Sequence, residues 1–123
     1  MEKKKILVVD DDKNIVELLR VNLIDAGYEV IAAFDGYQAV NAAHKQKPDL
    51  IVLDIMLPAG GGTTVMDRLR ISSDTAVIPV IAISALPKDQ AKEKLSSYHV
   101  NEFFSKPLDV PALVKAINES LQK

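Results

Sequence analysis

The 123-residue sequence contains no cysteine, which excludes disulfide bonds and thiolate metal sites. It has no apolar run near the ~18 residues that a membrane-spanning helix needs, and no signal peptide precedes the first charged residues. The net charge of −2 leaves no broad basic face for nucleic acid, and the basic residues 3–5 are typical of a solvated tail. We therefore expect a cytoplasmic protein without direct contact to a membrane or to nucleic acid.

Short apolar segments alternate along the chain with segments of helical period. The apolar segments are mostly rich in β-branched or aromatic residues, as strands are, and lie at residues 5–9, 28–33, 49–54, 77–84 and 101–105. A helical pattern follows each of them, the first ending near Gly27 and the others at residues 37–46, 64–71, 88–98 and 109–122. Five such units predict an α/β fold with one parallel sheet, in a single domain over residues 1–123 with no effector domain.

Hydrophobic spacing predicts which helix faces are buried. The first helix has four apolar residues on one face: Ile15, Leu18, Leu19 and Leu23. The last helix has the clearest stripe: Val110, Leu113, Val114, Ile117 and Leu121. Segment 88–98 offers only Ala91, Leu95 and Tyr98 as inward candidates, so we expect it to lie loosely on the surface.

Polar residues stand at the ends of four predicted strands. Asp10, Asp11 and Asp12 follow the first strand, Asp54 ends the third, Ser84 ends the fourth and Lys106 follows the fifth. Because parallel strands share one carboxyl edge, these side chains should converge. Carboxylates without cysteine or a well-placed histidine make a hard oxygen site that suits Mg²⁺. An aspartate can attack phosphorus, and a lysine can pair with a phosphate oxygen.

The three adjacent carboxylates at residues 10–12 require compensation. Two unit charges ~4 Å apart repel by roughly 4 kcal/mol at an effective dielectric near 20. Capping the following helix needs only one aspartate. The sequence therefore favours a bound cation over helix capping alone.

Four motifs carry a resemblance to a known family. They are ILVVDDD at residues 6–12, DLIVLDIMLP at 49–58, VIAISA at 80–85 and FFSKPL at 103–108. In this order they resemble the receiver domain of two-component response regulators, and the resemblance covers essentially the whole chain. It implies a flavodoxin-like sheet of five parallel strands in the order 2-1-3-4-5, with helices on both faces.

The resemblance also implies roles for individual residues. Asp54 is the expected phosphoacceptor, Lys106 is expected to reach the phosphoryl group, and Lys106–Pro107 is expected to be a cis peptide. Mg²⁺, with Mn²⁺ as an alternative, is expected on Asp11, Asp54 and the backbone carbonyl of Met56, with Asp10 acting through water. Ser84 and Phe103 occupy the switch positions, and Asp12 is given no metal role.

By the same resemblance the protein is a phosphorylation-dependent switch rather than an enzyme acting on a separate substrate. The resemblance also implies that it catalyses its own phosphoryl transfer and dephosphorylation. The expected donor is a histidine kinase or a phosphotransfer protein. Segments 88–98, 101–105 and 109–122 are expected to form the face that binds a downstream protein or effector domain differently after phosphorylation. The expected oligomeric state is a monomer or weak dimer.

The sequence departs from the family pattern at two places. Gly61 replaces the usual Asp or Asn before the loop glycine, which is Gly62 here, and His99 and Val100 replace a frequent Gly-Ala pair. These changes bear on the details of switching and leave the phosphorylation chemistry intact.

Three other functions are alternatives to the phosphorylation switch. A haloacid-dehalogenase-type enzyme would use Asp10 and Asp12, but Asn14 stands where Thr or Val is usual and no later acidic pair is evident. A flavodoxin would need a phosphate-cradling first loop, which three carboxylates would repel. A phosphorylation-independent interaction module would not need the intact set of site residues.

Met56 and Leu86, two residues after Asp54 and Ser84, should flank the path of the water that hydrolyses the phosphoryl group. Both are large and apolar, which hinders the positioning of a water molecule. We therefore expect slower self-dephosphorylation than in a Met56→Asn/Leu86→Glu variant.

Overall fold

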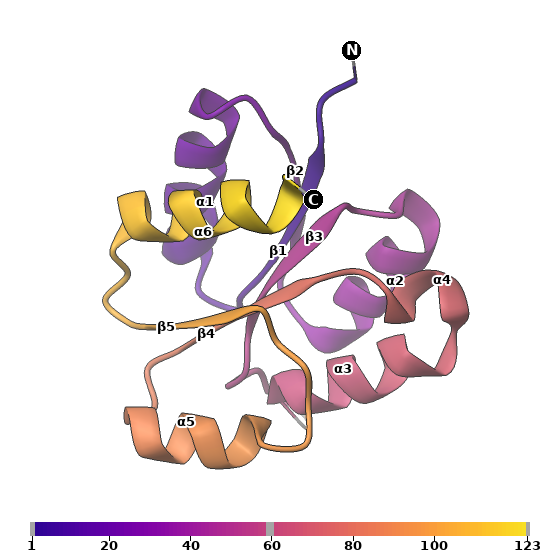
Figure 1. The fold of residues 1–123 in the computed structure, drawn as a ribbon, viewed down its shortest axis with the longest axis vertical. Helices are drawn as coiled ribbons and strands as arrows, with labels where there is room; N and C mark the ends of the chain where they lie inside the picture. Colours follow the sequence, from indigo (N-terminus) through magenta and orange to yellow (C-terminus); the bar gives the residue numbers. More distant parts are fainter. Residues whose placement is uncertain (1, 59–60, 123) are drawn as a thin grey trace.

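Five parallel strands form one sheet in the order β2-β1-β3-β4-β5, as the resemblance implies (Figure 1). The computed structural model describes residues 2–58 and 61–122. The strands are β1 (Lys5–Val9), β2 (Glu29–Ala33), β3 (Leu50–Asp54), β4 (Val80–Ser84) and β5 (Glu102–Ser105). The helices are α1 (Lys13–Asp25), α2 (Gly36–Gln46), α3 (Gly61–Ile71), α4 (Ser73–Ala76), α5 (Lys88–Leu95) and α6 (Val110–Leu121). The α/β class is therefore confirmed.

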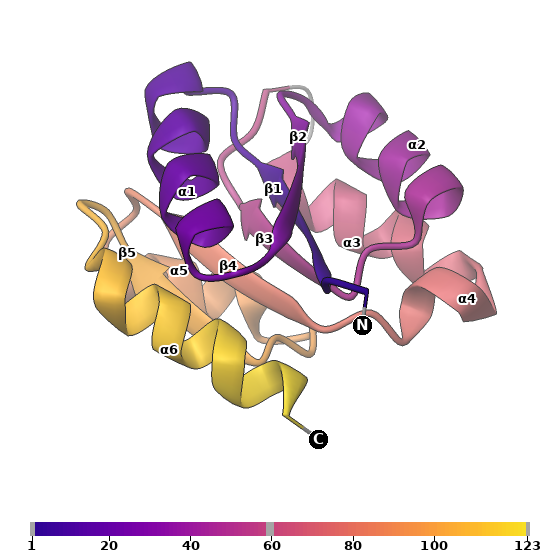
Figure 2. The same ribbon diagram turned by 90° about the horizontal axis from the view of Figure 1, so that it is seen from above.

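Helices cover both faces of the sheet, with α1 and α6 on one side and α2 and α3 on the other (Figure 2). Successive strand residues point to opposite faces. In β1, Leu7 packs in the core under α2, α3 and α5, whereas Ile6 and Val8 pack in the core under α1 and α6. β1, β3 and β4 are therefore buried on both faces, which is why their apolar runs are continuous.

Two predicted features of the helices are wrong in detail. Leu18 is 43% exposed, and Val16 instead joins Leu19 and Leu23 in the buried stripe of α1. These three residues are spaced by three and four positions, which keeps them on one face, whereas Leu18 lies on its flank. Helix α3 begins at Gly61, three residues earlier than expected.

The segment between α3 and β4 also differs from the prediction. The single-turn helix α4 was not expected, and the predicted strand at 77–84 begins only at Val80. Thr75 of α4 is buried, and its hydroxyl donates a hydrogen bond of 2.6 Å to the carbonyl oxygen of Leu69 near the end of α3. One turn is too short to produce a hydrophobic period, so the sequence pattern could not reveal it.

Helix α5 has the loose attachment that its composition predicts. Ala91 and Leu95 are its buried residues, and its other members are exposed. The helix ends at Leu95, three residues before the predicted end, and Tyr98 lies half-buried in the turn that follows.

The carboxyl edge of the sheet leads directly into helix N-termini. Asp12 is the N-cap residue of α1, and its side chain accepts a hydrogen bond from the Asn14 amide at 2.9 Å. Asp109 caps α6 in the same manner through the Ala112 amide. Such caps stabilise a helix by about 1 kcal/mol each. Within the described ranges, no helix combines the length and apolarity required to cross a membrane.

Candidate functional site

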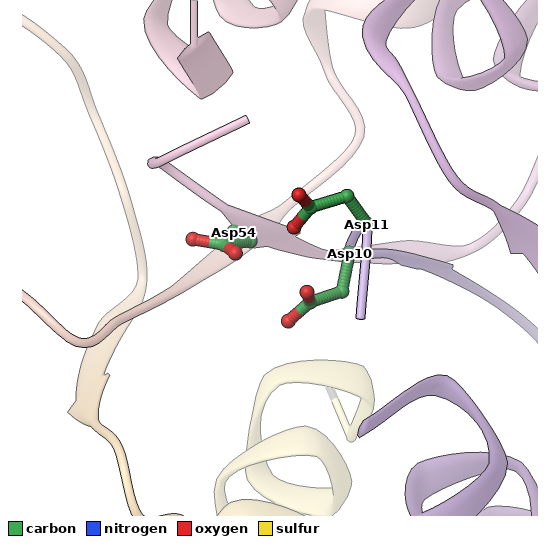
Figure 3. A group of neighbouring side chains, drawn as sticks. All are labelled: Asp10, Asp11 and Asp54. Atoms are coloured by element: carbon green, nitrogen blue, oxygen red, sulfur yellow. The ribbon is translucent and has the colours of Figure 1, made fainter. Parts of the chain in front are cut away.

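Three carboxylates meet at the carboxyl edge of the two central neighbouring strands (Figure 3). Asp10 and Asp11 follow β1, and Asp54 ends β3; the pairing of Val9 with Leu53 brings the strand ends level. One oxygen atom from each carboxylate lies within 4.8 Å of the others. Asp10 and Asp54 are 0% and 3% exposed, whereas Asp11 is exposed. The predicted convergence of these residues is therefore present in the fold.

Lys106 supplies the positive charge of the site. Its Nζ atom lies 2.7 Å from Asp10 Oδ2 and 3.2 Å from Asp54 Oδ2. The lysine follows β5, and its backbone amide donates a hydrogen bond of 2.8 Å to the carbonyl oxygen of Ser84 at the end of β4. The peptide bond between Lys106 and Pro107 is cis, as the resemblance implies. One cation thus bridges two buried carboxylates that come from different strands.

Backbone amides fix the orientation of both buried carboxylates. The amide of Asp12 donates to Asp10 Oδ1, and the amide of Met56 donates to Asp54 Oδ1, each at 2.9 Å. The Oδ2 atoms are thereby turned toward Lys106. The sequence does not reveal these two amide donors, because the side chain at a position does not show which carboxylate the backbone N–H group there will bind.

Burial and charge shift the ionisation of this cluster. Burial raises the pKa of the Asp10 carboxyl, and the Asp54 charge adds to the effect, although Lys106 and the Asp12 amide oppose it. Burial lowers the pKa of Lys106, but the contact with Asp10 and the charge of Asp54 outweigh it and raise the pKa overall. Lys106 therefore remains an ammonium group at neutral pH, and the pKa of the Asp10 carboxyl lies above that of an ordinary aspartate.

The donor set fits a hard divalent cation. Carboxylate oxygens are the preferred protein ligands of Mg²⁺ and Mn²⁺, and no histidine takes part in this cluster. Within the described ranges, Asp10 Oδ2 has the ion pair with Lys106 but no hydrogen bond of suitable geometry. A buried oxygen with this spare capacity suits a hydrogen bond from metal-bound water. Asp10, Asp11 and Asp54 could therefore bind a metal ion.

Ser84 lies on β4, the strand next to Asp54, and Phe103 lies on β5, one strand further along the sheet. Ser84 is fully buried at the end of β4, and its hydroxyl accepts a hydrogen bond of 3.0 Å from the Leu86 amide. The pairing of Asp54 with Ile83 places Ser84 one position beyond the aspartate. Phe103 of β5 is half-buried against the core under α2, α3 and α5. Their switching roles remain predictions.

Gly62 fixes the start of α3 against the backbone that follows Asp54. A Cβ atom on this glycine would lie 2.6 Å from the carbonyl oxygen of Asp54 and 2.7 Å from the Cα atom of Ile55. Only glycine permits such an approach. Gly61 has a positive φ of 74°, and its Cβ would lie 2.9 Å from the Ile55 carbonyl oxygen. The two glycines thus position the helix that follows the site.

The geometry also bears on the alternative functions. Asp12 caps α1 and is exposed, so it does not join Asp10 in the paired arrangement that a haloacid-dehalogenase-type site would use. Two surface cavities in the described part of the chain, of about 500 Å³ and about 200 Å³, are not lined by Asp10, Asp11 or Asp54. Charge and donor chemistry, rather than cavity size, therefore mark the functional site.

Comparisons with known proteins agree with this geometry. The family model of the response regulator receiver domain matches residues 6–118. The chain is 43% identical over 119 residues to the alkaline phosphatase synthesis transcriptional regulatory protein PhoP of Bacillus subtilis, covering 93% of this chain and 48% of PhoP. It is 39% identical over 119 residues to the DNA-binding dual master transcriptional regulator RpaA of Synechocystis, covering 97% of this chain and 49% of RpaA. The chain thus spans about half the length of these two curated relatives.

A solved structure has the same fold. The receiver domain of a sensor histidine kinase from Pseudomonas aeruginosa superposes with a TM-score of 0.90 at 25% identity, covering 99% of this chain and 100% of that chain. That structure holds a magnesium ion in its active-site cleft. Phosphorylation-dependent signalling is the general function of the family whose model matches residues 6–118. The sheet order, the acidic cluster and the family match together show that this chain belongs to the response regulator receiver domain family.

Proposed function

We propose that Asp54 accepts a phosphoryl group from a histidine kinase or a phosphotransfer protein, with Mg²⁺ as cofactor. The observation that carries this proposal is the meeting of three carboxylates, with oxygens within 4.8 Å of one another, beside the ammonium group of Lys106. Asp10 and Asp54 both turn an Oδ2 atom toward Lys106 while an amide holds the Oδ1 atom, but Asp10 is the more buried and lies closer to the ammonium group, at 2.7 Å against 3.2 Å. Asp54 is therefore the more available nucleophile of these two, and the resemblance to receiver domains gives it the phosphoacceptor role.

The transfer itself requires few protein groups. An oxygen of the Asp54 carboxylate forms a bond to phosphorus as the bond from phosphorus to the donor nitrogen breaks, and the donor leaves as a neutral imidazole because its other ring nitrogen carries a proton. Lys106 then pairs with a phosphoryl oxygen in place of Asp54 Oδ2. Asp11, Asp54 and the backbone carbonyl of Met56 would hold Mg²⁺ directly, and Asp10 would act through water. When bound, the ion offsets negative charge on the carboxylates and on the transferring group. Mn²⁺ would fit the same ligands.

The switch follows from the position of Ser84. Its hydroxyl now accepts a hydrogen bond from the Leu86 amide, but it can rotate to donate to a phosphoryl oxygen on Asp54. Movement at this point of β4 displaces the segment that leads into α5, and the half-buried Phe103 can repack beside it. We propose that the face formed by α5, β5 and α6 then binds its partner differently.

The phosphorylated state should be long-lived compared with that of a more polar variant. Met56 is 48% exposed and Leu86 is half-buried, and each stands two residues beyond a residue of the site. Their apolar side chains offer an attacking water no hydrogen-bond partner. In this proposal the domain catalyses its own phosphorylation and its own dephosphorylation, the latter slowly, without acting on a separate substrate.

The output of the switch lies with a downstream protein or an effector domain. The two curated relatives are named as transcriptional regulators, and about half of their length lies outside the part that this chain matches. We propose that residues 1–123 form a single receiver domain that is a monomer or weak dimer in the cytoplasm. In this proposal the domain does not contact nucleic acid itself.

Intact mass spectrometry tests the proposed chemistry. The wild-type protein, incubated with acetyl phosphate and Mg²⁺, should gain one phosphoryl group, and the Asp54→Asn variant should gain none. Asp25→Asn is the matched control, because Asp25 is an exposed aspartate at the end of α1. Full modification of Asp54→Asn, or no modification of the wild type, would overturn the proposal.

A further inference from the structure

The attachment of α5 to the rest of the fold depends on few contacts. Its buried residues are Ala91 and Leu95, and Pro87 at its N-terminal boundary makes no side-chain capping hydrogen bond. Burying one leucine and one alanine stabilises a helix far less than a full apolar stripe does. The contacts at the far end of α5 therefore carry much of its restraint.

Two side chains of α3 hold the turn between α5 and β5. The hydroxyl of Tyr98 donates a hydrogen bond of 2.8 Å to Asp67 Oδ1. The guanidinium of Arg70 lies over the Tyr98 ring, 4.3 Å from its centroid, and its Nη2 atom donates a hydrogen bond of 2.8 Å to the carbonyl oxygen of Ser97. We call these four residues, Asp67, Arg70, Ser97 and Tyr98, the Tyr98 clamp. Its two α3 members are three positions apart, so they share one helix face.

The other end of α3 is fixed at the phosphorylation site. The Gly62 amide donates a hydrogen bond of 3.1 Å to the Ile55 carbonyl oxygen, and the glycine lies against the backbone of Asp54. Helix α3 therefore starts beside Asp54 and reaches the turn after α5. This connection is separate from the one that runs through Ser84 and Phe103.

The Tyr98 ring has room to leave the clamp. A cavity of about 200 Å³ is lined in part by Leu69, Arg70, Tyr98 and His99. The ring is only half-buried, so its displacement exposes little apolar surface. The hydrogen bond to Asp67 raises the pKa of the Tyr98 phenol, which agrees with a hydroxyl that donates to a carboxylate. A clamp with open space beside it can take a closed and a released arrangement.

We propose that the Tyr98 clamp restrains α5 in the unphosphorylated protein and couples α5, through α3, to the backbone beside Asp54. Release of the clamp frees the end of α5, and this favours the rearranged state that phosphorylation stabilises. The signalling part of this inference depends on the proposed phosphorylation of Asp54, whereas the restraint of α5 does not.

The test compares amide hydrogen exchange in α5 among four variants. Tyr98→Phe keeps the ring but removes the hydroxyl, and Arg70→Gln removes the stacked guanidinium. Both should raise exchange over residues 88–97 by about fivefold, the effect of losing one hydrogen bond to a charged group at a partly exposed site. Asp67→Asn retains a hydrogen-bond acceptor and should change exchange less. Tyr37→Phe is the control, since Tyr37 is 81% exposed on α2.

A second measurement tests the coupling to phosphorylation. Tyr98→Phe should react with acetyl phosphate about twofold to threefold faster than the wild type, because it populates the rearranged state more often. Unchanged exchange over residues 88–97, or an equal rise in β1 and β3 that marks global destabilisation, would overturn the restraint. Raised exchange with an unchanged reaction rate would overturn the coupling. A wild type that is never phosphorylated would refute the proposed function and leave the exchange result standing.

Discussion

Replacing Lys106 with methionine removes the cation that pairs with two buried carboxylates. Methionine keeps an unbranched side chain of similar length but has no charge. Asp10 and Asp54, which are 0% and 3% exposed, then lose the ammonium group that lies 2.7 Å and 3.2 Å from their Oδ2 atoms. Without bound metal, the variant should therefore be much less stable than the wild type at neutral pH.

The size of the expected loss of stability follows from the burial of the ion pairs that Lys106 makes with Asp10 and Asp54. Removing one partner of a buried ion pair costs about 3–5 kcal/mol. The Lys106 side chain is 18% exposed, so solvent screens part of the interaction. We expect the free energy of unfolding to fall by about 3 kcal/mol at pH 7, which is a large share of the ~5–15 kcal/mol typical of a domain.

The loss of stability in Lys106→Met should depend on pH in a definite direction. Burial already raises the pKa of Asp10 in the wild type, and loss of Lys106 raises it further. A carboxyl whose pKa is higher in the folded than in the unfolded state gives stability that is present at low pH and lost as pH rises through the folded pKa. The difference in stability between the variant and the wild type should therefore shrink between pH 7 and pH 4.5.

Urea unfolding of both proteins at these two pH values, with chelator present, measures the effect. Lys115→Met is the control, because Lys115 is an exposed lysine on α6 and should change stability by less than ~0.5 kcal/mol. Adding Mg²⁺ should restore part of the lost stability in Lys106→Met, since a bound cation replaces the missing charge. A loss below ~1 kcal/mol, or an equal loss at both pH values, would refute the reasoning about this cluster.

Two further predictions concern the glycine at the start of α3 and the two apolar side chains that flank the path of the hydrolytic water. Gly62→Ala should lower stability by about 2–3 kcal/mol in denaturant unfolding, because its Cβ would lie 2.6 Å from the Asp54 carbonyl oxygen. Gly27→Ala, which has φ of +99° but nothing within 4 Å of its Cβ, should lose only about 1–2 kcal/mol, and a larger loss there than at residue 62 would contradict the steric argument. The Met56→Asn/Leu86→Glu variant should lose its phosphoryl group faster than the wild type in a phosphate-release assay, and equal or slower loss would count against the apolar shielding of the site.

The sheet and the convergence of the site could be predicted because strand patterns and strand ends are local. The continuous apolar runs of β1, β3 and β4 reflect burial on both faces. Once the strands are parallel, Asp10, Asp54 and Lys106 must reach the same edge. The order of the strands came from the family resemblance, since no periodicity in the sequence determines it.

Other features depend on contacts that no local pattern records. The single turn of α4 lacks a hydrophobic period, and the exposure of Leu18 depends on which flank of α1 meets the sheet. The Tyr98 clamp joins residues 31 positions apart, and neither Asp67 nor Tyr98 is marked by its neighbours in sequence. Such contacts arise only after the helices have packed, so they are visible in the fold and not in the sequence.

Mapping the modified residue tests the central claim most directly. The protein is incubated with a phosphodonor in the presence of Mg²⁺ or of chelator, and the acyl phosphate is located by tandem mass spectrometry of peptides. The account predicts one phosphoryl group, on Asp54, that forms with Mg²⁺ and fails to form with chelator. A phosphoryl group on Asp10 or Asp11, or equal modification of Asp54 without metal, would contradict it.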